Sequence, residues 1–159
     1  MDIAKTSTKC SKYHMRNFIN IVEAHNVIVA YHGSSTPIEL FYPLTHFGSL
    51  RAAKERMAFK NAQKQYLHKV SLRIINPLRV DDNEASDEAT LLNARIKGKY
   101  LDLNLNILRS KGTVAALADA GYDGMVYQNR MEDMGQDSWV ITNSDQVIRS
   151  QIVTEAGEK

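Results

Sequence analysis

Apolar positions in the first half of the chain follow helical and strand periods in turn. Residues 13–25 carry apolar side chains at intervals of three and four, which is typical of a helix packed on one side: Met15, Phe18, Ile19 and Val22. Residues 27–31 are a run of branched and small apolar side chains and predict a buried strand. Residues 49–63 predict a helix, and residues 64–75 alternate with a period of two, which predicts a strand ending at Asn76-Pro77.

The second half of the chain predicts helices first and strands afterwards. Residues 84–108 have a mostly helical pattern with a break at Gly98, and residues 113–121 predict a short helix ended by Gly121. Three later segments have the apolar, branched character of strands: residues 124–129, 138–142 and 146–153.

This order of elements does not repeat as strand, helix, strand. It therefore predicts an α+β fold with a bent, mostly antiparallel sheet flanked by helices, in a single domain. We divide that domain into an N-terminal segment and helix (1–26), a core (27–150) and a C-terminal tail (151–159).

Composition narrows the function classes only slightly. The chain has 159 residues, 43% of them hydrophobic and 24% charged, which is the make-up of an ordinary globular domain. Its formal charge of +2 permits contact with a nucleic acid without arguing for one. Its one cysteine, Cys10, excludes an internal disulfide and indicates a reducing compartment or indifference to redox state.

The sequence lacks the patterns of a membrane segment, a signal peptide, a common nucleotide-binding motif and a zinc site. It has no apolar run long enough to span a membrane and no pattern of a cleavable signal peptide. We therefore expect a cytoplasmic protein, or one delivered into a host cell by another route, without a membrane partner. Neither GxGxxG nor GxxxxGK[ST] occurs, and the five histidines lack the spacing of a zinc site, so we expect no metal.

Polar residues recur where predicted strands and helices end. His32-Gly33-Ser34 follows the first strand, Thr45-His46-Phe47-Gly48-Ser49 precedes a helix, and Glu132 lies in an acidic loop before the strand at 138–142. The segments 76–82 and 121–141 show the same concentration of polar residues. Each segment taken singly has a structural explanation as a strand end, a helix cap or a solvated hairpin.

Taken in order, these segments resemble the ADP-ribosyltransferase superfamily, particularly the small domains of bacterial and phage polyvalent proteins and effectors. In its histidine-bearing branch a first strand ends in His-Gly-Ser/Thr, an aromatic and hydroxyl motif opens a helix, and a late strand region brings a glutamate. The resemblance covers residues 27–150. It implies a split sheet and a mono-ADP-ribosyltransferase that moves ADP-ribose from NAD to a macromolecule.

The resemblance also implies roles for individual residues. His32 and Glu132 would be catalytic, and ten residues would bind NAD: His32, Gly33, Ser34, Tyr42, Thr45, His46, Phe47, Gly48, Ser49 and Tyr122. Gly33 lacks a Cβ, so its backbone could pair with the nicotinamide carboxamide, while His32 would bond a ribose hydroxyl. Among the aromatic residues, Phe47 and Tyr42 rank ahead of Tyr122 for stacking on the nicotinamide ring. Ser49 would place a hydroxyl and a helix terminus near the phosphates.

Glu132 is the expected catalytic carboxylate. Cleavage of the nicotinamide–ribose bond passes through an oxocarbenium-like state, which a carboxylate stabilises. Asp133 and Asp137 reach less far from the same loop. The sequence departs from two branches of the family here. The poly-ADP-ribose polymerase-like branch has its catalytic glutamate directly before the apolar strand, and the arginine-modifying branch has the second glutamate of a Gln/Glu-x-Glu pair there. This chain has Ser138 at that position.

Other functions remain open at this stage. A domain of the same fold could bind or hydrolyse NAD without modifying a macromolecule, or could be an inactive interaction module. A nuclease using His32 and His46 as acid and base is a further alternative. For the transferase we expect a protein acceptor rather than a nucleic acid, a role as toxin, effector or phage host-modifying protein, and a cognate inhibitor or antitoxin.

Overall fold

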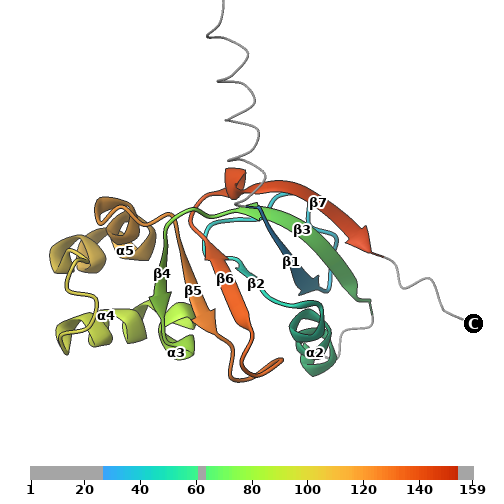
Figure 1. Cartoon of the computed structure of the whole chain (residues 1–159), viewed down its shortest axis with the longest axis horizontal. Helices are drawn as coiled ribbons and strands as arrows, with labels where there is room; N and C mark the ends of the chain where they lie inside the picture. Colours follow the sequence, from blue (N-terminus) through green and yellow to red (C-terminus); the bar gives the residue numbers. More distant parts are fainter. Residues whose placement is uncertain (1–26, 61–63, 154–159) are drawn as a thin grey trace, which may run out of the picture.

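Two sheets form the centre of the molecule. The computed structural model describes residues 27–60 and 64–153, so the predicted helix at 13–25 and Cys10 lie outside the described residues. The first sheet has the order β1 (Val27–Ser34), β3 (Tyr66–Arg73) and β7 (Val147–Val153), all antiparallel. The second has the order β2 (His46–Phe47), β6 (Asp137–Ile141), β5 (Gly124–Gln128) and β4 (Pro77–Val80) (Figure 1).

The two sheets meet where β1 passes the end of β2. The backbone N–H of Tyr31 donates to the carbonyl of Gly48 at 2.8 Å, and the N–H of Gly48 donates back at 2.9 Å. A Cβ on Gly48 would lie 3.0 Å from Ala52 Cβ and 3.1 Å from Ser138 Oγ, so glycine permits this close approach. This junction brings the end of β1 next to β2 and β6.

Helices cover the sheets unevenly. Helix α2 (Leu50–Lys60) packs beside β1, whereas α3 (Asp82–Ser86), α4 (Glu88–Ile96) and α5 (Leu105–Asp119) lie on the β4 side (Figure 1). The helix α5 begins at the cap Asn104, whose side chain accepts from the N–H groups of Asn106 and Ile107. It contains a kink at Gly112, where φ is +83°.

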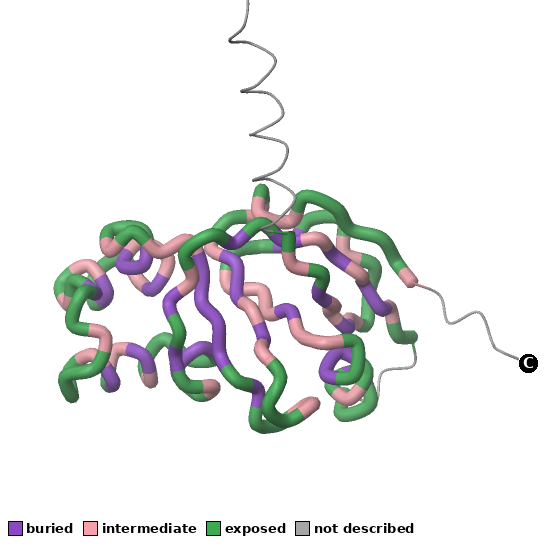
Figure 2. Tube along the Cα trace, viewed as in Figure 1, coloured by how far each residue is buried: buried purple, intermediate pink, exposed green. Residues whose placement is uncertain are grey.

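Each sheet has its own apolar core. Between the second sheet and the helices, the core includes fully buried Leu91, Leu117 and Val140. Figure 2 shows buried positions concentrated along β5 and β6. Near the junction a second core contains Phe41, Phe47, Val70, Leu72 and Ile141. Burial of these side chains supplies the main driving force for the fold.

The α+β class and the mostly antiparallel pairing predicted from the sequence are confirmed. Among the described residues one strand pair is parallel, β4 with β5, and it adds to the predicted fold because the sequence pattern predicts no strand directly after Asn76-Pro77. Pro77 begins β4 at an edge of the second sheet, a position where proline is tolerated. The terminating residues therefore mark the passage from one sheet to the other.

Other boundaries agree with the sequence prediction in part. The break predicted at Gly98 is present and extends over residues 97–104, and the helix predicted from residue 113 follows the kink at Gly112 inside α5. Gly121, at φ +84°, ends this helical region as predicted. The strand β7 extends to Val153 by pairing with Leu67, so residues 151–153 belong to the sheet rather than to a tail. None of the described helices is long and apolar enough to cross a membrane.

Candidate functional site

A cleft of about 580 Å³ opens beside the junction of the two sheets. Its walls come from the end of β1, the segment 38–48, one side of α2, the start of α3 and the β5–β6 region. Eight of the residues expected to act on NAD line it: His32, Gly33, Tyr42, Thr45, His46, Phe47, Gly48 and Glu132. These residues come from distant parts of the sequence, so the fold gathers most of the predicted site in one place.

Three predicted residues lie outside the cleft. The Ser34 hydroxyl donates to the Thr36 carbonyl at 2.6 Å and faces buried His68. Ser49 caps α2, accepting from the N–H of Ala52 at 3.0 Å. Tyr122 packs against the helical core and donates to Asp102. Ser34, Ser49 and Tyr122 therefore do not line this cleft, and their side chains take part in local caps and packing.

The order expected for the stacking aromatics also changes. Phe47 is 1% exposed and packs with its ring centroid 5.1 Å from that of Phe41, so its faces are used by the core. Tyr42 is 69% exposed at the rim of the cleft. Tyr42 is therefore the predicted aromatic residue whose ring is free to meet a ligand.

His32 is held as a neutral imidazole. Its Nδ1–H donates to the backbone carbonyl of His46 at 2.8 Å, which leaves Nε2 as an acceptor. The ring packs edge-on against Phe41, with centroids 5.6 Å apart. Burial lowers the pKa of His32 below its ordinary value, although the bond to the carbonyl opposes that shift.

His46 occupies a second polar position in the cleft. Its Nδ1 lies 3.0 Å from the Tyr127 hydroxyl. Burial, and then the neighbouring His32, lower the pKa of His46, while Asp82 and Glu132 act in the opposite direction. Burial also raises the pKa of Tyr127 to about 12, so this hydroxyl keeps its proton at neutral pH.

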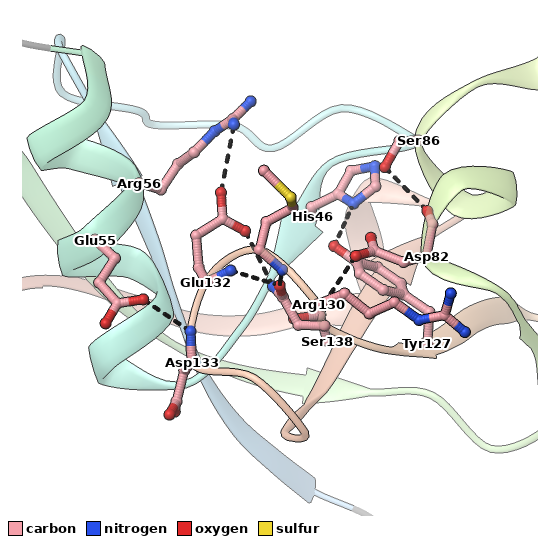
Figure 3. Close-up of polar contacts among 12 residues, drawn as sticks. His46, Glu55, Arg56, Asp82, Ser86, Tyr127, Arg130, Glu132, Asp133 and Ser138 are labelled. Atoms are coloured by element: carbon pink, nitrogen blue, oxygen red, sulfur yellow. Dashed lines mark hydrogen bonds and ion pairs between the residues drawn. The ribbon is translucent and has the colours of Figure 1, made fainter.

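Glu132 projects from the β5–β6 loop toward α2 (Figure 3). Its side chain is 14% exposed, and its Oε1 lies 3.3 Å from Arg56 Nη1. Its Oε2 accepts from Asn129 Nδ2 at 3.2 Å. The carboxylate therefore lines the same cleft as His32 and is held from two sides.

Asn129 organises the loop that carries Glu132. This side chain is 4% exposed, and its Oδ1 accepts from the N–H groups of Met131 at 2.9 Å and Glu132 at 2.8 Å. The backbone of Asn129 pairs with Gln136 and Gly135 across the loop. The sequence carries a signal for this loop, because an asparagine directly after a strand commonly forms an Asx turn.

The cleft is also lined by polar residues that the sequence pattern does not predict as site residues: Arg56, Lys60, Asp82, Ser86, Tyr127 and Ser138. Arg56 and Lys60 are one helical turn apart on α2, so they present positive charge on one face. Asp82 accepts from the backbone N–H of Arg130 at 2.9 Å (Figure 3). The cleft thus combines a cationic wall with two carboxylates and two neutral imidazoles.

The other loop acids do not line the cleft. Asp133 accepts from the Ser49 hydroxyl, and its backbone N–H donates to Glu55 at 2.8 Å. Asp137 pairs with Arg79 through bonds of 2.9 and 2.8 Å. Glu132 is therefore the loop acid that lines the cleft together with His32. Among the described residues, no group of three or more His, Cys, Asp or Glu side chains could hold a metal ion.

Replacing Gly33 is expected to damage the fold as well as the cleft. A Cβ at this position would lie 2.4 Å from Met57 Cγ and 2.7 Å from the Ala53 carbonyl, so α2 would have to move. We expect Gly33→Val to lower the free energy of unfolding by about 1–3 kcal/mol, as overpacked cores do. Urea denaturation measures this, and an unchanged midpoint would contradict the close packing of β1 and α2.

Among known proteins, no family model, curated protein or solved structure matches the chain.

Proposed function

We propose that the protein is a mono-ADP-ribosyltransferase that moves ADP-ribose from NAD to a macromolecular acceptor. The observation that carries the proposal is the cleft in which His32, Gly33 and Glu132 lie together. His32 and Glu132 are 100 positions apart in the sequence, so their presence in one cleft is a property of the fold. Arg56 and Lys60 add positive charge suited to a dinucleotide's phosphates.

In the proposed reaction the bond between C1′ of the ribose and the nicotinamide nitrogen breaks. Nicotinamide leaves with the bonding electron pair, and a nucleophile of the acceptor bonds to C1′ and loses its proton. Positive charge grows on the ribose in the transition state, and the Glu132 carboxylate stabilises it. His32 Nε2, left as an acceptor by the bond at Nδ1, would orient a ribose hydroxyl.

The proposal is tested with NAD itself. If NAD binds the folded protein, it raises the melting temperature by mass action, whereas an inactive scaffold of the same fold shows no shift. Incubating the protein with labelled NAD and a host lysate then separates transfer from hydrolysis. Label on a polymer supports transfer, and release of free ADP-ribose alone supports NAD hydrolysis.

We expect a protein acceptor and a role as toxin, effector or phage host-modifying protein, which implies a cognate inhibitor or antitoxin. Digesting the labelled product with protease or with nuclease distinguishes the two classes of acceptor. Label that becomes small after protease treatment supports a protein, and label released only by nuclease contradicts it.

Substitution of His32 is expected to weaken NAD binding by about 1–2 kcal/mol, the scale of one lost hydrogen bond. The best variant is His32→Asn, because its amide N–H can still donate to the His46 carbonyl while Nε2 is removed. Titration calorimetry measures the affinity. His32→Ala removes both nitrogens and serves as a comparison that also loses stability. Full NAD affinity in His32→Asn would remove His32 from the binding site.

The nuclease alternative is less well supported by the cleft. Catalysis by two histidines needs one protonated and one neutral imidazole at the working pH. Burial lowers the pKa of both His32 and His46, which disfavours the protonated form that one of them would need. Cleavage of RNA or DNA without NAD, lost on substitution of either histidine, would favour the nuclease.

A further inference from the structure

The second histidine of the cleft is in contact with a chain of buried polar side chains. His46 Nδ1 lies 3.0 Å from the Tyr127 hydroxyl, and Tyr127 stands directly across from Ser138 in the pairing of β5 with β6. Ser138 is 2% exposed, and its side chain lies on the same face of the sheet as that of Tyr127. Asn129 Nδ2 lies 3.2 Å from Ser138 Oγ. Polar side chains from β2, β5, β6 and the β5–β6 loop thus form one continuous group.

Asn129 fixes the direction of the first hydrogen bond in this group. Its Oδ1 accepts from two backbone N–H groups, of Met131 and Glu132, so its oxygen and nitrogen are assigned without ambiguity. Its Nδ2 must therefore donate, one proton to Glu132 and one to Ser138. Ser138 accepts from Asn129 and keeps its own proton, which it can donate to the Tyr127 oxygen opposite. The Tyr127 O–H is then free to donate to His46 Nδ1.

We infer that Asn129, Ser138 and Tyr127 form a hydrogen-bond relay that fixes the tautomer of His46, so that its Nε2 carries the proton and donates to an oxygen of the bound ligand. Among the described residues, His46 Nε2 has no hydrogen-bond partner, although His46 lines the cleft. The three relay members are positioning residues. The same Asn129 amide also holds Glu132, so one side chain orients both the carboxylate and the imidazole.

The two histidines of the cleft therefore present opposite groups. His32 donates through Nδ1 to the His46 carbonyl, which leaves its Nε2 as an acceptor. His46 accepts at Nδ1, which leaves its Nε2–H as a donor. A ribose diol or a carboxamide both donates and accepts, so either group matches this pair. Only the choice of a dinucleotide as ligand rests on the proposed function; the tautomers do not depend on it.

Nitrogen-15 NMR of histidine-labelled protein, without ligand and at pH 7.5, tests the relay. We expect His32 to show the spectrum of the Nδ1–H tautomer and His46 that of the Nε2–H tautomer. In Tyr127→Phe, Nδ1 of His46 loses its donor, so its spectrum should shift toward a mixture of tautomers while His32 is unchanged. A wild-type His46 protonated at Nδ1, or no change in Tyr127→Phe, would overturn the inference.

Tyr66→Phe is the matched control, because Tyr66 lies on β3 outside the cleft and its hydroxyl has no hydrogen bond within the described residues. It should leave both spectra unchanged. For the ligand, NAD is added to the same samples, and Tyr127→Phe should bind it about twofold to tenfold more weakly. Correct tautomers without an NAD response would uphold the relay and contradict the proposed function, so the two failures are distinguishable.

Discussion

Glu132→Gln is expected to reduce ADP-ribose transfer roughly a hundredfold or more while NAD affinity changes little. The loss is the scale of one electrostatic stabiliser removed from a transition state. The charge on the ribose is largest in that state, so the carboxylate contributes little to ground-state binding. Glutamine keeps the length of the side chain, and its oxygen can still accept from Asn129. Single-turnover rates and calorimetric binding of NAD measure the two quantities separately.

The matched control for Glu132→Gln is Asp137→Asn. It removes a carboxylate of the same loop region whose partner is Arg79 rather than a group in the cleft. We expect Asp137→Asn to keep normal transfer, and Asp133→Asn tests the remaining acid. Full transfer by Glu132→Gln, with loss in either aspartate variant, would contradict the assignment of Glu132. Retention of activity by all three variants would contradict the mechanism.

Asn129→Ala is expected to lower the free energy of unfolding by about 2–3 kcal/mol. It deletes the acceptor of two backbone N–H groups and the donor to Ser138, and buried polar groups left without partners are costly. Transfer should fall as well, because Glu132 loses one of the two groups that hold it. Urea denaturation measures stability, and a two-state fit gives the change.

Asn143→Ala is a suitable comparison for Asn129→Ala. Asn143 also accepts from a backbone N–H, that of Asp145 at 3.0 Å, but it caps a short surface turn away from the cleft. We expect a loss of about 0.5–1 kcal/mol and unchanged transfer. Equal losses in the two variants would mean that Asn129 acts only as an ordinary cap.

Local patterns were sufficient for most secondary structure and for part of the site. The run at 27–31 and the alternation from Tyr66 to Ile74 correspond to β1 and β3, because burial on one or both faces leaves a periodic trace in the sequence. The motif around His32 and the loop glutamate Glu132 were likewise visible as polar residues at strand ends. Where the helical break continues to residue 104 or a short strand begins at Pro77, local propensity is too weak to place the boundary.

The sequence alone determined the α+β class, the strands β1, β3, β5, β6 and β7, and the candidates His32 and Glu132. Only the tertiary structure decided that these two residues share a cleft, since Glu132 reaches it through the turn held by Asn129. It also decided that Ser49 and Tyr122 are used for capping and packing, and that Arg56 on α2 faces the carboxylate. These outcomes depend on contacts between residues far apart in the chain, and one sequence carries no local pattern for such contacts.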